Sequence, residues 1–133
     1  LPWGRIQMTP AVHSSALELS DGENRAMGVA SGYLIKAAGR ALYHAGDTAL
    51  FGDMSLIGRH ALDLALIPMG DRYTMGPDDA LESLNLLRPR LTVPMHYNTF
   101  DAIRTDPAAF ARRAVAAGHA ARVMAAGESL NLQ

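Results

Sequence analysis

The chain has 133 residues, 49% of them hydrophobic and 19% charged, and a net charge of −1 from 12 basic and 13 acidic side chains. This composition suits one compact domain, argues against disorder, and gives no basic field for nucleic acid or apolar run for a membrane helix. Cysteine is absent, so a metal site must use His, Asp or Glu. We expect a cytoplasmic protein.

The first half of the chain is predicted to be mainly β-structure. Apolar and polar residues alternate from Ile6 to Val12, which predicts a half-buried strand, and His13 follows its end. A second strand is expected at residues 29–36. The remaining segments, in chain order, are a polar loop at 20–24, a turn at 38–40, a hairpin strand at 41–44 and a short helix at 53–60.

In the second half, predicted strands alternate with helices, which is typical of an α/β fold. The apolar run from Leu62 to Met69, interrupted only by Asp63, predicts a buried strand. Pro77 suits a first helical position, so a helix is expected through residue 87. The other segments are a loop at 70–76, a strand at 91–94, a helix from Asp106 to near 118, and two closing strands at 122–125 and 129–132.

Three residues that can bind metals each follow a predicted strand, namely His13, Asp47 and His96. Open α/β sheets gather reactive groups at strand ends, and two imidazoles with a carboxylate are a ligand set of hydrolytic metal sites. Each residue also has a plainer interpretation. His13 could be a surface histidine, Asp47 a turn former and His96 a core histidine.

Several strings resemble one family of hydrolases. HAGDT at residues 44–48 closely resembles the Gly-Asp element of the metallo-β-lactamase superfamily, and VHSS at 12–15 resembles an earlier ligand element. GDRYTMGP at 70–77 and VPMHYNTF at 93–100 resemble the UPF0173 metal-dependent hydrolases, which are related to ascorbate-6-phosphate lactonases. These motifs occur in the family's order.

The resemblance implies both a fold and a metal centre. The fold is the C-terminal half of an αββα sandwich, a mixed sheet with flanking helices, and residues 1–133 form half of one domain. His13 would complete a first metal site, Asp47 would bridge two metals and His96 would complete the second. Two divalent ions are implied, with zinc expected and manganese, iron or nickel also compatible. Their hydroxide would attack an ester, lactone or phosphoester bond of a small molecule.

The family's H-x-H-x-D-H motif, which carries four further ligands, does not occur in this chain. The chain also begins with Leu1 rather than Met, and we expect it to be a piece of something longer. The N-terminal half of the fold is therefore an expected partner, on the same or a separate polypeptide. The isolated chain is expected to be inactive, and homo-oligomerisation is left open.

Other polar residues near the motifs are weaker candidates for substrate contact or ligand orientation. His44 belongs to HAGDT and could orient a ligand. Asp71, Tyr73 and Thr74 lie on the loop after a buried strand, although turn formation explains Asp71 equally well. Asn98 could donate to a substrate oxygen or cap a local turn.

Two other functions remain to be weighed against a hydrolase. The missing motif favours a non-catalytic structural or interaction module that lacks a metal site. Redox chemistry at a di-iron centre also occurs in the superfamily, but such members usually carry a flavin-binding domain, which this chain lacks.

Overall fold

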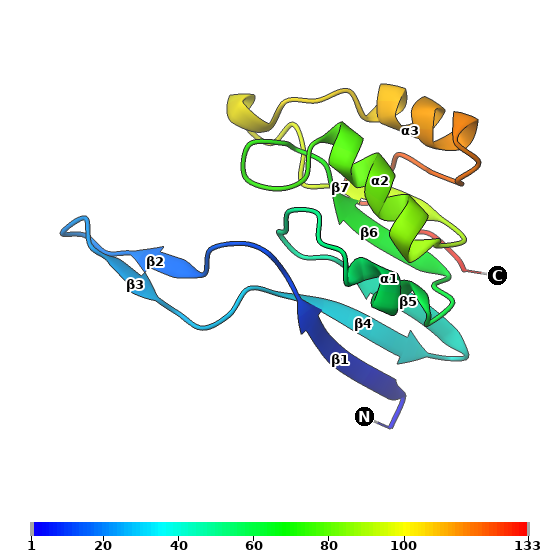
Figure 1. The fold of residues 1–133 in the computed structure, drawn as a ribbon, viewed down its shortest axis with the longest axis horizontal. Coiled ribbons are helices and arrows are strands. Elements are labelled where there is room, and N and C mark those ends of the chain that lie inside the picture. The colour runs from blue at the N-terminus through cyan, green and yellow to red at the C-terminus, as the bar shows by residue number, and fades with distance from the viewer. Residues whose placement is uncertain (1, 133) are drawn as a thin grey trace.

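A computed structural model describes residues 2–132 as a mixed five-stranded sheet with flanking helices and a separate two-stranded hairpin (Figure 1). The α/β fold predicted from the sequence is confirmed. In chain order the elements are β1 (Gly4–Pro10), β2 (Ala16–Glu18), β3 (Asn24–Ala26), β4 (Ser31–Ala37), β5 (Arg40–His44), α1 (Met54–Gly58), β6 (Leu64–Pro68), α2 (Pro77–Leu87), β7 (Thr92–Met95), the 3-10 helix η1 (Asp101–Ile103) and α3 (Pro107–Ala116).

The main sheet has the strand order β1-β4-β5-β6-β7. Strands β1, β4 and β5 pair antiparallel, and Ala38 and Gly39, with φ of 49° and 74°, make the tight turn between β4 and β5. Strands β5, β6 and β7 pair parallel. Since two antiparallel pairings separate β1 from β5, strands β1, β5, β6 and β7 all end at the same edge of the sheet.

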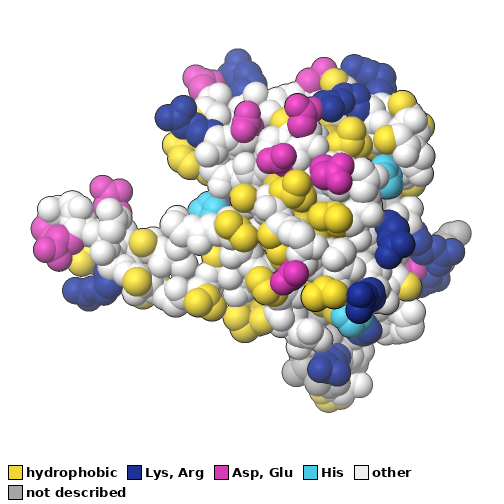
Figure 2. Space-filling model, in the orientation of Figure 1, with side chains coloured by type: hydrophobic (Ala, Val, Ile, Leu, Met, Phe, Trp, Pro, Cys, Tyr) yellow, Lys and Arg dark blue, Asp and Glu magenta, His cyan; other side chains and the backbone are white. Residues whose placement is uncertain are grey.

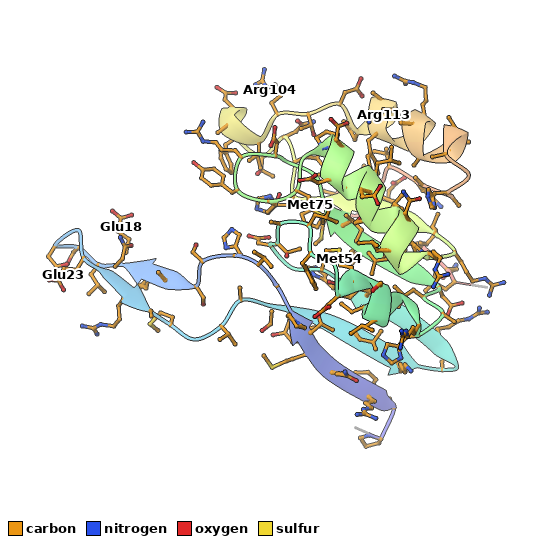
Figure 3. The ribbon with its side chains drawn as sticks, viewed as in Figure 1. Glu18, Glu23, Met54, Met75, Arg104 and Arg113 are labelled. Carbon is orange, nitrogen blue, oxygen red and sulfur yellow. The ribbon has the colours of Figure 1, made fainter. Side chains whose placement is uncertain are left out.

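The helices cover one face of this sheet (Figure 1). The crossings from β5 through α1 to β6 and from β6 through α2 to β7 proceed in the same direction across the sheet, so both helices fall on one side. Figure 3 marks Met54 and Met75 within this layer, and both are fully buried. The sheet contributes Leu34, Tyr43, Ala65 and Ile67 to the core, and the helices contribute Met54, Ile57, Ala80, Leu84, Leu87, Phe110 and Ala114.

The opposite face of β1 and β4 leaves apolar side chains exposed. Ile6, Met8 and Tyr33 are 45%, 59% and 42% exposed, and strand pairing places them on one side of the sheet. A shallow groove of about 340 Å³ lies on this face, lined by Ile6, Tyr33, Ile35, His44 and Gly46. Gly46, which lines the groove, directly precedes Asp47 in the chain.

The β2–β3 hairpin extends away from the body of the protein (Figure 1), and acidic side chains lie at its far end in the space-filling view (Figure 2). All residues of both strands are exposed, and Glu18 and Glu23 lie at the end remote from the sheet (Figure 3). An isolated two-stranded hairpin has little stability of its own in water. The polar loop expected at 20–24 connects these two strands. The strands themselves were not predicted from the sequence.

Two of the expected strands are wrong. Residues 122–125 and 129–132 form no strand, and the only pairing in this region of the described chain is an isolated bridge between Thr92 and Ala121. Val123 is 38% exposed, so its apolar side chain does not anchor the segment to the sheet. The other helices and strands that were predicted from the sequence lie within a few residues of their expected positions. Asp106 caps α3 as expected, accepting a hydrogen bond from the backbone N–H of Ala109.

An ion-pair network stabilises the end of the sheet opposite the candidate site. Asp63 accepts a hydrogen bond from the backbone N–H of Ala41 at 2.9 Å and pairs with Arg40 at 3.0 Å and Arg90 at 3.3 Å. The Ala41 N–H, followed by the Arg40 guanidinium, lowers the pKa of the Asp63 carboxyl. This explains the polar interruption in an otherwise apolar run, because Asp63 joins β5, β6 and the residues before β7.

Candidate metal centre

The three candidate ligands, His13, Asp47 and His96, come to one edge of the sheet because of its topology, together with Asp71 of the weaker candidates. His13 follows β1, Asp47 follows β5, Asp71 follows β6 and His96 follows β7. All four strands end at this edge, so the loops that carry these residues are neighbours. Strand β4 separates β1 from β5, so the end of β1 is not next to the end of β5 in the sheet.

The HAGDT string makes a sharp turn that only glycine fits. Gly46 has a φ of 66°, and a Cβ at this position would collide with the carbonyl oxygen of Ser31. The backbone N–H of Gly46 donates to Nδ1 of His44 at 3.1 Å. His44 thus stabilises the turn that presents Asp47, which agrees with a role in orienting a ligand.

Thr48 ties this turn to the residues that follow β1. Its side chain is fully buried, and its hydroxyl accepts from the backbone N–H of Val12 at 2.8 Å and donates to the carbonyl of Ala49 at 2.8 Å. The Ala49 N–H in turn donates to the Val12 carbonyl at 2.9 Å. These bonds link the residue before His13 to the residues after Asp47, although β4 lies between β1 and β5 in the sheet.

Asp47 and His96 face each other across the ends of β5 and β7. Nε2 of His96 lies 3.4 Å from Oδ2 of Asp47, and their side chains are 29% and 47% exposed. Two donor atoms that each lie about 2.0–2.1 Å from a tetrahedral cation are separated by about 3.3–3.4 Å. The spacing and the chemistry of this pair therefore fit a divalent metal such as zinc.

The backbone at His96 is held in an uncommon conformation. Its φ is 54°, and a Cβ at the neighbouring Gly70 would collide with its carbonyl oxygen, so the two loops pack closely here. Nδ1 of His96 is buried without a hydrogen-bond partner among residues 2–132. Only Nε2 is thus directed at Asp47.

His13 is turned toward its own backbone. Its Nδ1 lies 2.8 Å from the carbonyl oxygen of Ser14, an atom that can only accept, so Nδ1 carries the proton. Histidines that bind metals commonly donate one ring N–H to a carbonyl in this way, which leaves Nε2 free as the ligand. Within the described part of the chain, however, no three His, Asp or Glu side chains gather closely enough to hold a metal. The structure brings together Asp47 and His96 but not His13.

The weaker candidates mostly shape their own loops. Asp71, with a φ of 64°, accepts at Oδ1 from the Arg72 N–H at 2.8 Å and at its carbonyl from the Thr74 N–H at 3.1 Å. Asn98, with a φ of 59°, accepts at Oδ1 from the Thr105 N–H at 2.8 Å. The hydroxyl of Thr74 donates to the Met75 carbonyl at 3.4 Å. Turn formation thus accounts for Asp71 and Asn98, and Thr74 bonds locally.

Three residues with contacts on these loops, Thr48, Arg72 and Phe100, were not among the candidates predicted from the sequence. Thr48 belongs to HAGDT, but nothing in its sequence context shows that its hydroxyl would reach Val12. Phe100 and Arg72 both contact Tyr73. The contact between Tyr73 and Phe100 joins two loops that are far apart in the chain, so only the fold reveals it.

Residues 2–97 match the family model described as the β-lactamase superfamily domain. A UPF0173 metal-dependent hydrolase from Opitutus terrae is 61% identical over 132 residues, covering 99% of this chain and 58% of the relative. One from Thermus thermophilus is 50% identical over 129 residues, covering 97% of this chain and 56% of the relative. The chain thus spans somewhat more than half the length of these relatives.

Solved structures agree with the sequence comparisons. Igni18, described as a novel metallo hydrolase from the archaeon Ignicoccus hospitalis, matches with a TM-score of 0.83 and 44% identity, covering 97% of this chain and 53% of that chain. In the described part of the chain, no helix has both the length and the apolar character needed to cross a membrane. The family match, the mixed sheet and the flanking helices together show that the chain belongs to the metallo-β-lactamase superfamily.

Proposed function

We propose that this chain is part of a metal-dependent hydrolase and that Asp47 and His96 are two of its metal ligands. The observation that carries the proposal is the distance of 3.4 Å between Nε2 of His96 and Oδ2 of Asp47. This spacing suits two donors that share one cation. The relatives named metal-dependent hydrolases support the same reading.

The donor set supports a centre of two metals, in which His13 binds one ion and His96 the other. His13 has a free Nε2 because its Nδ1 is occupied by Ser14. Asp47 has two carboxylate oxygens on a partly exposed side chain and suits a bridge between the ions. Divalent ions bound here would act as Lewis acids and activate water, and zinc is the first candidate. His44 and Thr48 hold the turn that presents Asp47.

We further propose that the site is completed by another part of the same fold, which supplies the remaining ligands. The exposed apolar face formed by Ile6, Met8 and Tyr33 supports this, because a second β-layer would bury it as in a sandwich. His44 and Gly46 of the HAGDT string line the groove on this face, so a covering layer would contact the turn that presents Asp47. The substrate would be a small molecule with an ester, lactone or phosphoester bond.

The test is the metal content of the protein in its complete form. We expect about two equivalents of metal by elemental analysis, and less than one in Asp47→Asn and in His96→Gln. Hydrolysis of a panel of esters, lactones and phosphoesters is expected to fall by at least about a hundredfold in Asp47→Asn. Asp71→Asn is the matched control, because asparagine keeps the oxygen that Asp71 uses in its turn and tolerates a positive φ.

If Asp47→Asn and Asp71→Asn retain the same metal content, Asp47 is not a ligand and the proposal fails. A protein that binds metal in the predicted ratio but hydrolyses nothing in the panel would keep the metal centre and refute the choice of bond.

The second candidate function is a non-catalytic interaction module. The lack of a third donor beside Asp47 and His96 within residues 2–132 favours it. This candidate predicts under one equivalent of metal in the complete protein, together with unchanged folding of Asp47→Asn. The same measurement therefore separates the two functions.

A further inference from the structure

Two exposed aromatic rings and an arginine gather on the loops that follow β6 and β7. The rings of Tyr73 and Phe100 have their centroids 6.2 Å apart, and the guanidinium of Arg72 lies 5.7 Å from the centroid of Tyr73. Tyr73 and Phe100 are 52% and 49% exposed despite this contact. We call Arg72, Tyr73 and Phe100 the aromatic rim. Large apolar side chains that stay exposed together mark a surface available for binding.

The rim is built on the two loops that frame Asp47 and His96. Phe100 belongs to the segment that begins at His96, directly after β7. Tyr73 belongs to the loop after β6, whose Met75 N–H donates to the carbonyl of Thr48 at 3.0 Å, next to Asp47. The rim is thus connected to both members of the candidate metal pair by a few residues of ordered backbone.

Both loops are held in fixed conformations rather than left free. Asp71 and Arg72 have φ of 64° and 46°, and Asn98 has a φ of 59°. Such angles are costly for residues other than glycine and persist only where the surroundings impose them. Here the constraints are the bond from the Asp71 N–H to the Met75 carbonyl at 3.0 Å and the bond from the Thr105 N–H to Asn98. The rim is therefore pre-organised.

The charge of the rim is uncompensated. Arg72 takes part in none of the ion pairs formed among residues 2–132. Arg104, which directly follows η1 (Figure 3), is paired with Asp101 at 2.6 Å. Arg72 is thus free to bind an anion while its stem and the two rings offer a flat apolar surface.

We propose that the aromatic rim recognises the non-reacting part of the substrate, a planar aromatic or unsaturated group that carries a carboxylate or phosphate. This inference rests on the proposed hydrolase function and names the substrate class of that site. The planar group packs against Tyr73 and Phe100, and its anionic oxygens pair with Arg72. The scissile bond then lies toward Asp47 and His96.

The kinetic test uses the complete metal-loaded protein and three esters: an aryl ester with a ring carboxylate, the same aryl ester without charge, and a cyclohexyl ester with the carboxylate. We expect Arg72→Gln to lower kcat/KM about tenfold for the carboxylated aryl ester, through a higher KM, and by less than twofold for the uncharged one. Phe100→Leu is expected to lower kcat/KM for both aryl esters and to spare the cyclohexyl ester. Arg104→Gln is the matched control and is expected to change none of them by more than twofold.

A binding test separates this inference from the hydrolase proposal. Benzoate and phenyl phosphate are titrated calorimetrically into metal-free protein and into metal-free Arg72→Gln, so that no catalysis is needed. Weaker binding of either anion to Arg72→Gln supports the rim even if no ester is hydrolysed, and the preferred anion distinguishes carboxylate from phosphate substrates. Equal binding to both proteins, or an equal loss of binding in Arg104→Gln, would overturn the proposal that the rim binds the anionic group. Hydrolysis that does not depend on Arg72 would also overturn the rim proposal, but it would leave the proposed metal-dependent hydrolase function standing.

Discussion

The backbone N–H of Val12 donates to the buried hydroxyl of Thr48 at 2.8 Å, and this bond links the end of β1 to the turn that carries Asp47. Strand β4 lies between β1 and β5, so sheet pairing alone leaves His13 two strands away from Asp47. The hydroxyl of Thr48 serves as acceptor for Val12 and donor for Ala49 at once. The buried Thr48 side chain therefore ties the residue before His13 to the residue after Asp47.

Replacing Thr48 with valine keeps the shape of the side chain but removes both bonds. We expect Thr48→Val to lower the free energy of unfolding by about 1–3 kcal/mol, because it leaves the Val12 N–H without its acceptor. Thr48→Ser keeps the hydroxyl and is expected to retain slow hydrogen exchange at the Val12 amide. Urea unfolding and amide exchange measure the two effects. Fast exchange at Val12 in both variants would show that the bond is unimportant.

Gly46 and Gly39 form a matched pair for testing the turn. Both have positive φ, 66° and 74°, but a Cβ at Gly46 would collide with the Ser31 carbonyl whereas a Cβ at Gly39 has no atom within 4 Å. We expect Gly39→Ala to cost about 1–2 kcal/mol of unfolding free energy from conformation alone. Gly46→Ala is expected to cost clearly more and to lower metal content, since the turn that presents Asp47 must shift. Equal losses in the two variants would contradict this.

The lowered pKa of Asp63 predicts how the stability of the protein changes in acid. Its pKa is lowered in the folded protein, so its contribution is present above its usual value near 3.9 and is lost as pH falls through the lower, folded value. We expect Asp63→Asn to be less stable than the parent at pH 7, with the difference shrinking below about pH 4. Thermal unfolding of metal-free protein at several pH values gives the comparison. Asp101→Asn, which removes an exposed ion pair, is the control and is expected to have little effect.

The raised pKa of Tyr43 predicts how the stability of the protein changes at alkaline pH. Burial raises the pKa of Tyr43 to about 12, with the neighbouring Thr9 hydroxyl opposing part of the rise. The two hydroxyls do not reach hydrogen-bond geometry, and each is buried without a partner among residues 2–132. The stabilisation from a raised pKa is present below about pH 10 and is lost as pH rises toward the folded value.

We therefore expect the parent to lose stability between about pH 10 and 12 relative to Tyr43→Phe. At pH 7 the variant is expected to match the parent or exceed it slightly, because the phenylalanine ring removes a buried hydroxyl that lacks a partner. Denaturant unfolding of both proteins across this range is the measurement. A marked loss of stability in Tyr43→Phe at pH 7 would show that the hydroxyl makes a stabilising bond.

Local signals in the sequence predicted most of the body of the fold. Pro77 with its acidic neighbours marked the start of α2, and Asp106 marked the cap of α3, because these residues act through bonds and angles of adjacent backbone. Strands β2 and β3 were missed because three residues are too few to show a period. The closing strands expected at 122–125 and 129–132 were wrong, because this region pairs with β7 only through the isolated bridge between Thr92 and Ala121.

The candidate site was predictable only as far as strand ends and the family resemblance allowed. These placed Asp47 and His96 at one edge, and the distance between them is consistent with the prediction. The position of His13 depends on Thr48, and the aromatic rim depends on contacts between two loops, so neither has a local signal. The assignment of all three residues as ligands stays a prediction.

The mixed sheet also has a consequence for the order in which the protein folds. Strands β4 and β5 join through a tight turn and can pair early, since little chain entropy is lost in closing a short loop. Asp47 and His96 meet only after both parallel crossings have formed. A cation that binds this pair would thus engage the last and least local part of the structure and would slow its opening. A bound metal would then stabilise the parallel half of the sheet against local unfolding, whatever chemistry it performs there.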